Sequence, residues 1–157
     1  MNWNVVNPSK LREIDLFAEL SDEALKELAA IMHIERFKRG ELIFGDGEPG
    51  RAMYLIAEGE VRISKQIEGL GEEALAILKP GSYFGEMGML DGEPTSAEAW
   101  ANRTCVLHAI KRDALLALMA KDRAMSVELL WSFVHTLSDR LRETNSKVTF
   151  LATAGRF

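Results

Sequence analysis

The feature that most constrains the fold is a succession of short apolar runs, broken by turns, that begins at about His33. The runs include HIERFKRG, AMYLIAEG and TCVLHAIKR, and about seven of them follow one another at roughly ten-residue intervals. Such runs, with Gly, Pro and Asp between them, are typical of antiparallel sandwiches and rolls. The chain has 157 residues and is 47% apolar, so it can bury a core between two sheets. The sequence therefore predicts an α+β domain built on an antiparallel β-roll, a double-stranded arrangement similar to a jelly roll.

Helical patterns stand on both sides of the predicted roll. Pro8 and Ser9 suit the start of a first helix, and Ser21 suits the N-cap of a second. After the roll, Asp113 and Asp122 are placed to cap two more helices. We expect one domain in three consecutive parts: an N-terminal helical segment over residues 1–32, the β-roll over 33–111 with an inserted segment at 81–101, and C-terminal helices over 112–157.

The last predicted helix has the most regular apolar spacing in the sequence. Its seam residues recur at alternating steps of three and four, which is the a and d pattern of a heptad. The seam consists of Val127, Leu130, Val134, Leu137, Leu141, Thr144, Val148 and Leu151. A helix packed only on its own domain more often has a wider apolar stripe, so the pattern favours a two-stranded coiled coil. We therefore predict a homodimer through this long helix, with packing inside one chain as the alternative.

Charge and composition exclude several classes of protein. With 24 acidic and 19 basic residues the net charge is −5, which argues against a surface that grips nucleic acid as a whole. The single cysteine, Cys105, forms no internal disulfide and fits a reducing compartment. The sequence has no secretory signal pattern and no uninterrupted apolar stretch of about 18 residues, so we expect a cytoplasmic protein without a membrane span. No nucleophilic elbow, GxxxxGK loop or HExxH motif occurs, so we expect neither an enzyme nor a metal or cofactor.

Four stretches of the sequence resemble the cyclic nucleotide-binding domain family, in particular the sensor half of catabolite activator and FNR-type bacterial regulators. They are LFAELSDEALKELA, GELIFGDGEPGRAMYLIAEGEVRI, PGSYFGEMGMLDGEP and LSDRLRETNSKV, in that order along nearly the whole chain. The resemblance implies the β-roll and a pocket formed by a short helix and loop inserted between strands. It also implies a cyclic nucleotide as the ligand, with cyclic AMP foremost.

The resemblance assigns pocket roles to a contiguous group and its neighbours: Phe84, Gly85, Glu86, Met87, Gly88, Ser96 and Ala97. On the family's pattern Gly85 permits close approach of the backbone, and Glu86 accepts a hydrogen bond from the ribose 2′-hydroxyl. The backbone N–H groups of Met87 and Gly88 would face the phosphate or ribose, as helix N-termini do for anions. Gly85 also has a plainer explanation as the glycine of a tight turn.

One position departs from the family's pattern. The family places an arginine, which pairs with the phosphate, directly before the Ser and Ala, and here that position is Thr95. Loss of a charge-assisted contact of roughly 1.5–3 kcal/mol weakens binding roughly ten- to a hundredfold. The hydroxyls of Thr95 and Ser96 remain as donors. Arg51, in a loop that the family places near the pocket, is a candidate replacement, although an ordinary exposed turn residue is the plainer explanation. The missing charge is thus supplied from elsewhere, replaced by neutral donors, or no longer needed.

The resemblance also gives the long helix a role. In the bacterial sensors this helix carries two polar residues that reach the adenine, one of them across the dimer, and Thr144 and Asn145 occupy those positions. An asparagine suits the N6 and N7 edge of adenine. The pair can equally serve only to fix register and dimer state in the seam. Regulators of this family continue into a helix-turn-helix, whereas this sequence ends at Phe157, so we expect no direct DNA binding.

Two functions are consistent with these residues. The first is a stand-alone dimeric sensor that binds a cyclic nucleotide and signals through its C-terminal helix to an unknown protein partner. The alternative is a degenerate member that no longer binds nucleotide and serves as a protein-interaction or dimerisation module. Thr95 favours the alternative, as do Glu93 and Glu98, which would repel a phosphate if they face the pocket.

Overall fold

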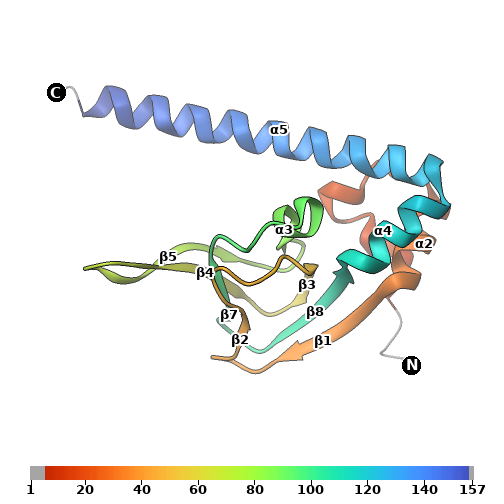
Figure 1. The fold of residues 1–157 in the computed structure, drawn as a ribbon, viewed down its shortest axis with the longest axis horizontal. Helices are drawn as coiled ribbons and strands as arrows, with labels where there is room; N and C mark the ends of the chain where they lie inside the picture. The colour runs from red at the N-terminus through yellow and green to blue at the C-terminus, as the bar shows by residue number, and fades with distance from the viewer. Residues whose placement is uncertain (1–5, 156–157) are drawn as a thin grey trace.

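The computed structural model describes residues 6–155 (Figure 1), so residues 1–5 and 156–157 of the predicted terminal segments lie outside the described residues. The predicted α+β fold, with antiparallel sheets, N-terminal helices and a long C-terminal helix, is confirmed. The N-terminal helices are α1 (Pro8–Leu11), η1 (Asp15–Phe17) and α2 (Asp22–Ile31). The strands are β1 (Met32–Phe37), β2 (Leu42–Phe44), β3 (Ala52–Glu58), β4 (Val61–Ile67), β5 (Gly71–Leu78), β6 (Tyr83–Phe84), β7 (Glu98–Ala101) and β8 (Cys105–Lys111). The remaining helices are α3 (Glu86–Asp91), α4 (Arg112–Lys121) and α5 (Arg123–Ala154).

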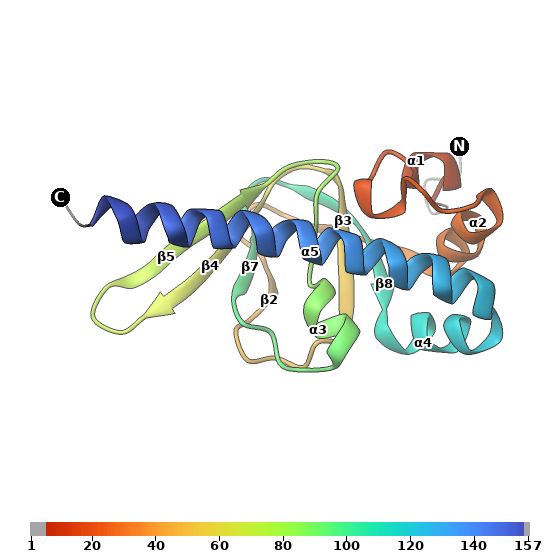
Figure 2. The ribbon, with the colours of Figure 1, turned by 90° about the horizontal axis from the view of Figure 1, so that it is seen from above.

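Within the described residues the strands form two four-stranded antiparallel sheets, with the orders β1-β8-β3-β6 and β2-β7-β4-β5. Side chains on alternate positions of a strand share a face, so β8 buries Cys105, Leu107 and Ala109. Cys105 and Leu107 join Ile56 and Val61 in the apolar core between the two sheets. A second core lies where the N-terminal helices pack against the first part of α5. The inserted helix α3 lies between the sheets and α5 (Figures 1 and 2).

Capping side chains fix where several helices begin. Ser21 and Asp122 each accept a hydrogen bond from a backbone N–H of the first helical turn, at 3.2 and 3.0 Å, and both predicted N-caps are confirmed. Asp113 is not the N-cap of α4, as the sequence suggested. That helix begins at Arg112, two residues earlier than expected, and its N-cap residue is Lys111. Asp113 lies in its first turn, where a carboxylate interacts favourably with the positive end of the helix.

The long helix α5 presents two different apolar faces. Its buried residues are Met125, Leu129 and Phe133, which belong to the helical core, and no described residue of α5 beyond Phe133 is buried. Figure 2 shows the rest of the helix passing over α3 and the β4–β5 hairpin. The apolar side chains of the predicted seam are all exposed: Val127, Leu130, Val134, Leu137, Leu141, Val148 and Leu151. The seam is therefore not buried by its own domain. Among the described residues, no helix combines the length and the apolar character that crossing a membrane requires.

Candidate functional site

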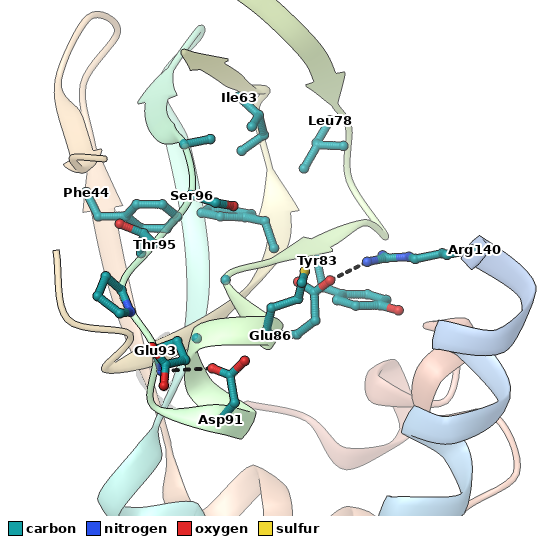
Figure 3. Close-up of a pocket in the computed structure, with 16 residues that line it drawn as sticks. Phe44, Ile63, Leu78, Tyr83, Glu86, Asp91, Glu93, Thr95, Ser96 and Arg140 are labelled. Atoms are coloured by element: carbon teal, nitrogen blue, oxygen red, sulfur yellow. Dashed lines mark hydrogen bonds and ion pairs between the residues drawn. The ribbon is translucent and has the colours of Figure 1, made fainter. Parts of the chain in front are cut away.

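A pocket of about 530 Å³ opens between α3, the segment at 94–97 and α5 (Figure 3). The segment at 94–97 lies on one side of the pocket, and Tyr83, Glu86 and Arg140 lie on the other. Apart from the two residues on the long helix, every residue that the family's pattern assigned to the pocket lines it: Phe84, Gly85, Glu86, Met87, Gly88, Thr95, Ser96 and Ala97. Two chain segments separated by several residues are thus brought to one pocket.

Gly85 is required by the backbone that builds the pocket. It has a φ of 79°, in the left-handed region, and it is the N-cap of α3. A Cβ at this position would lie 2.8 Å from the carbonyl oxygen of Ala52 on β3. Gly50 and Gly88 also approach so closely that a Cβ on Gly50 would overlap the Gly88 backbone. The tight turn is therefore enough to explain Gly85, and it holds α3 directly against β3 and the loop before it.

The buried carboxylate of Glu86 is paired with the long helix. Glu86 is only 6% exposed, and its Oε1 accepts a hydrogen bond from Nη1 of Arg140 on α5. The Arg140 guanidinium also lies 4.6 Å from the centre of the Tyr83 ring, in a cation–π arrangement. Burial raises the pKa of Tyr83, although Arg140 acts in the opposite direction, so the phenol is neutral at pH 7.

Sequence reasoning missed Arg140, although a signal for it was present. It lies four residues before Thr144, which puts both side chains on the same face of one helix. In the described structure Thr144 donates its hydroxyl to the backbone carbonyl of Arg140 at 2.9 Å. Thr144 and Asn145 are exposed, and neither lines the pocket of its own chain.

Thr95 lines the pocket, but its hydroxyl is used elsewhere. Oγ1 donates to the carbonyl of Gly45 at 2.6 Å and accepts from the backbone N–H of Glu48 at 3.1 Å. The backbone of Thr95 pairs with Gly47 and Glu48 as well, which joins the two DGEP turns. The expectation that this hydroxyl remains free to donate to a phosphate is therefore wrong, because the hydroxyl donates its hydrogen to the turn after β2.

Arg51 does not reach the pocket. It lines a neighbouring hollow, which shares Phe44 and Thr95 with the pocket, and it is not among the residues that line the pocket itself. The described structure therefore does not support Arg51 as the replacement for the family's arginine. The plainer explanation, an ordinary exposed turn residue, fits its position better.

Acidic side chains contribute to the pocket as well. Asp91 and Glu93 line it beside Glu86, and Asp91 accepts a hydrogen bond from the Glu93 backbone N–H at 2.8 Å. Glu98 does not line the pocket, because its carboxylate accepts from the indole N–H of Trp100 at 2.9 Å. Of the two acids that were expected to oppose a phosphate, one is thus at the pocket. The described residues contain no cluster of three or more His, Cys, Asp or Glu side chains placed to hold a metal ion.

Comparison with known proteins gives consistent matches. A model of the cyclic nucleotide-binding domain family matches residues 34–122. The CRP-like cAMP-activated global transcriptional regulator of Mycobacterium tuberculosis is 30% identical over 141 residues, which are 90% of this chain and 61% of that protein. The chain spans about three fifths of the length of this curated relative.

Two crystal structures share the fold over most of the chain. The Thermus thermophilus catabolite activator protein superposes with a TM-score of 0.77 and 33% identity, over 88% of this chain and 63% of that one. A cyclic nucleotide-binding domain from Methylobacillus flagellatus superposes with a TM-score of 0.77 and 30% identity, over 90% of this chain and 79% of that one.

Proposed function

This chain belongs to the cyclic nucleotide-binding domain family, and from that premise we propose that the pocket beside α3 binds a cyclic nucleotide, with cyclic AMP as the first candidate. The role we infer is regulatory and not catalytic. The named relatives are a transcriptional regulator, a catabolite activator protein and a cyclic nucleotide-binding domain, and none of these names describes an enzyme.

The observation that carries the proposal is the ion pair between Glu86 and Arg140, because it joins the pocket to the long helix. On the family's pattern Glu86 accepts a hydrogen bond from the ribose 2′-hydroxyl. A ribose at Glu86 would therefore lie beside the Arg140 guanidinium, and α5 would respond to the ligand through a single side chain. A ligand that favours one arrangement of this pair shifts the population of α5 positions.

The phosphate would lie against the segment at 94–97. Ser96 is the hydroxyl donor left at this end, because Thr95 is bonded to Gly45 and Glu48. Without the family's arginine, we expect binding to be roughly ten- to a hundredfold weaker than in a member that keeps it.

The exposed seam of α5 supports a dimer through which the sensor signals. Two copies that pair their α5 helices would cover the seven exposed apolar side chains of the seam. Pairing would also bring Thr144 and Asn145 of one copy towards the ligand of either copy, where an asparagine can bond the adenine edge. A partner protein would then read the position of the paired helices.

Binding is tested by titration calorimetry of the purified protein with cyclic AMP, cyclic GMP and cyclic di-GMP. We expect heat of binding with at least cyclic AMP, in the micromolar to millimolar range, and a rise in melting temperature, because a ligand that binds only the folded state stabilises it. An absence of both heat and melting shift at millimolar concentrations of all three ligands would refute the sensor function.

The degenerate-module alternative is favoured by the two further carboxylates at the pocket, Asp91 and Glu93, and by the engaged hydroxyl of Thr95. Thr95→Arg distinguishes the two functions, with Thr95→Val as the control that removes the same hydroxyl without adding charge. For a sensor, we expect Thr95→Arg to tighten cyclic AMP binding at least about tenfold over the wild type. Binding that appears only in Thr95→Arg would instead identify a lapsed site and support the docking role.

A further inference from the structure

The pocket has too little positive charge for an anionic ligand. Three carboxylates line it, from Glu86, Asp91 and Glu93, whereas Arg140 is the one cation among its described lining residues. The Arg140 charge is already paired with Glu86. A cyclic phosphate would therefore meet an excess of negative charge unless a further cation moves to it.

Lys65 on β4 lies on the face of the sheet that lines the pocket. Residues two apart along a strand share a face, so Lys65 lies on the same face of β4 as Ile63, which lines the pocket. The pairing of β4 with β7 ends with Ser64 opposite Glu98, so Lys65 directly follows, and Ala97 directly precedes, the last paired residues. Ala97 belongs to the segment against which the phosphate would lie.

The ammonium of Lys65 is held next to this segment by weak partners. Nζ donates to the backbone carbonyl of Ser96 at 3.1 Å and lies 3.9 Å from Oδ2 of Asp46. The first partner is neutral. The second is a distant carboxylate across an exposed gap, since 46% of the Lys65 side chain is accessible, and such pairs contribute little. The flexible four-carbon stem therefore lets the ammonium exchange these contacts for a stronger one.

We propose that Lys65 supplies the positive charge for the nucleotide's phosphate in place of the family's arginine, by moving its ammonium from the Ser96 carbonyl to a phosphate oxygen. This inference rests on the proposed cyclic nucleotide function of the pocket. The positive charge would then come from Lys65 on β4, whereas the family's pattern places it at the position of Thr95. Because the pair with Asp46 is weak and exposed, it opposes this movement little, and binding weakens as salt rises.

The test is calorimetry of cyclic AMP binding by Lys65→Gln, with Arg62→Gln as the matched control. Arg62 lies on the same strand but on the opposite face, where it bonds Glu72 at 2.9 Å, and both variants remove one positive charge. We expect Lys65→Gln to weaken cyclic AMP binding roughly tenfold, and Arg62→Gln to leave it unchanged. Lys65→Arg should retain binding, and Asp46→Asn should change it little, because the pair with Asp46 is weak.

A second readout separates charge from structure. Wild-type affinity should fall between about 0.05 M and about 0.5 M NaCl more steeply than that of Lys65→Gln. Adenosine lacks the phosphate, so it should bind the wild type and Lys65→Gln with equal affinity. Two results would overturn the role of Lys65 while the sensor function stands. One is equal cyclic AMP affinity of Lys65→Gln and Arg62→Gln. The other is a loss of adenosine binding in Lys65→Gln as large as its loss of cyclic AMP binding. A wild-type protein that binds no cyclic nucleotide overturns both.

Discussion

Replacing Leu130 and Leu141 by aspartate should abolish the dimer that we propose and leave a monomer. Both side chains belong to the predicted seam and are well exposed in the single chain, at 45% and 60%. A leucine buried at such a seam contributes about 1.5–3 kcal/mol, and each position is covered in both copies. A carboxylate there would lose this contribution and would also oppose its counterpart in the partner helix. Sedimentation equilibrium at micromolar protein measures the change directly.

Ser146→Asp is the matched control for this experiment, because Ser146 is an exposed residue of α5 outside the seam. We expect the control to stay dimeric. The folded domain itself should persist in the leucine variant, since neither side chain is part of a buried core. A wild-type protein that is monomeric at these concentrations, or a double variant that remains dimeric, would show that the seam does not pair two copies.

The second large effect concerns Glu86 and Arg140, because replacing Glu86 should weaken binding, whereas replacing Arg140 should destabilise the fold. Glu86→Gln removes a buried charge and leaves the half-exposed Arg140 to water, so we expect the free energy of unfolding to change little. Cyclic nucleotide binding should weaken roughly ten- to a hundredfold, because the acceptor for the ribose hydroxyl loses its charge.

Arg140→Gln should instead destabilise the fold. It leaves the Glu86 carboxylate buried without its cation, which we expect to cost about 1–2 kcal/mol, less than for a fully buried pair because Arg140 is 45% exposed. Arg142→Gln is the control, since Arg142 makes only an exposed pair with Asp139 on the same helix. Chemical denaturation and calorimetry on the three variants check both effects. Equal loss of stability in Arg140→Gln and Arg142→Gln would contradict the importance of the buried pair.

The fold could be predicted because its signals are local and repeated. Short apolar runs with turns indicated the antiparallel roll, and Ser21 and Asp122 indicated where helices begin. Two segments that line the pocket were also predictable. The residues of FGEMG follow one another, as do those of TSA, so knowledge of the family's pattern is enough to place them.

The charges of the pocket could not be predicted in the same way. Arg140 meets Glu86 across 54 positions of sequence, and its contact depends on how α5 crosses α3. Lys65 approaches Ser96 only through the register between β4 and β7. Whether Arg51 faces the pocket also could not be decided from the sequence, because the hydrogen bonds that join Thr95 to the neighbouring turn are long-range. Long-range pairing decides each of these positions, whereas local propensity does not.

The most direct test of cyclic nucleotide binding is a crystal structure of the protein grown with saturating cyclic AMP. We predict nucleotide density in the pocket, with the ribose at Glu86, the phosphate against Ser96 and Ala97, and the Lys65 ammonium on a phosphate oxygen. An empty pocket in crystals grown at saturating ligand, or a nucleotide bound away from α3, would contradict the proposed function.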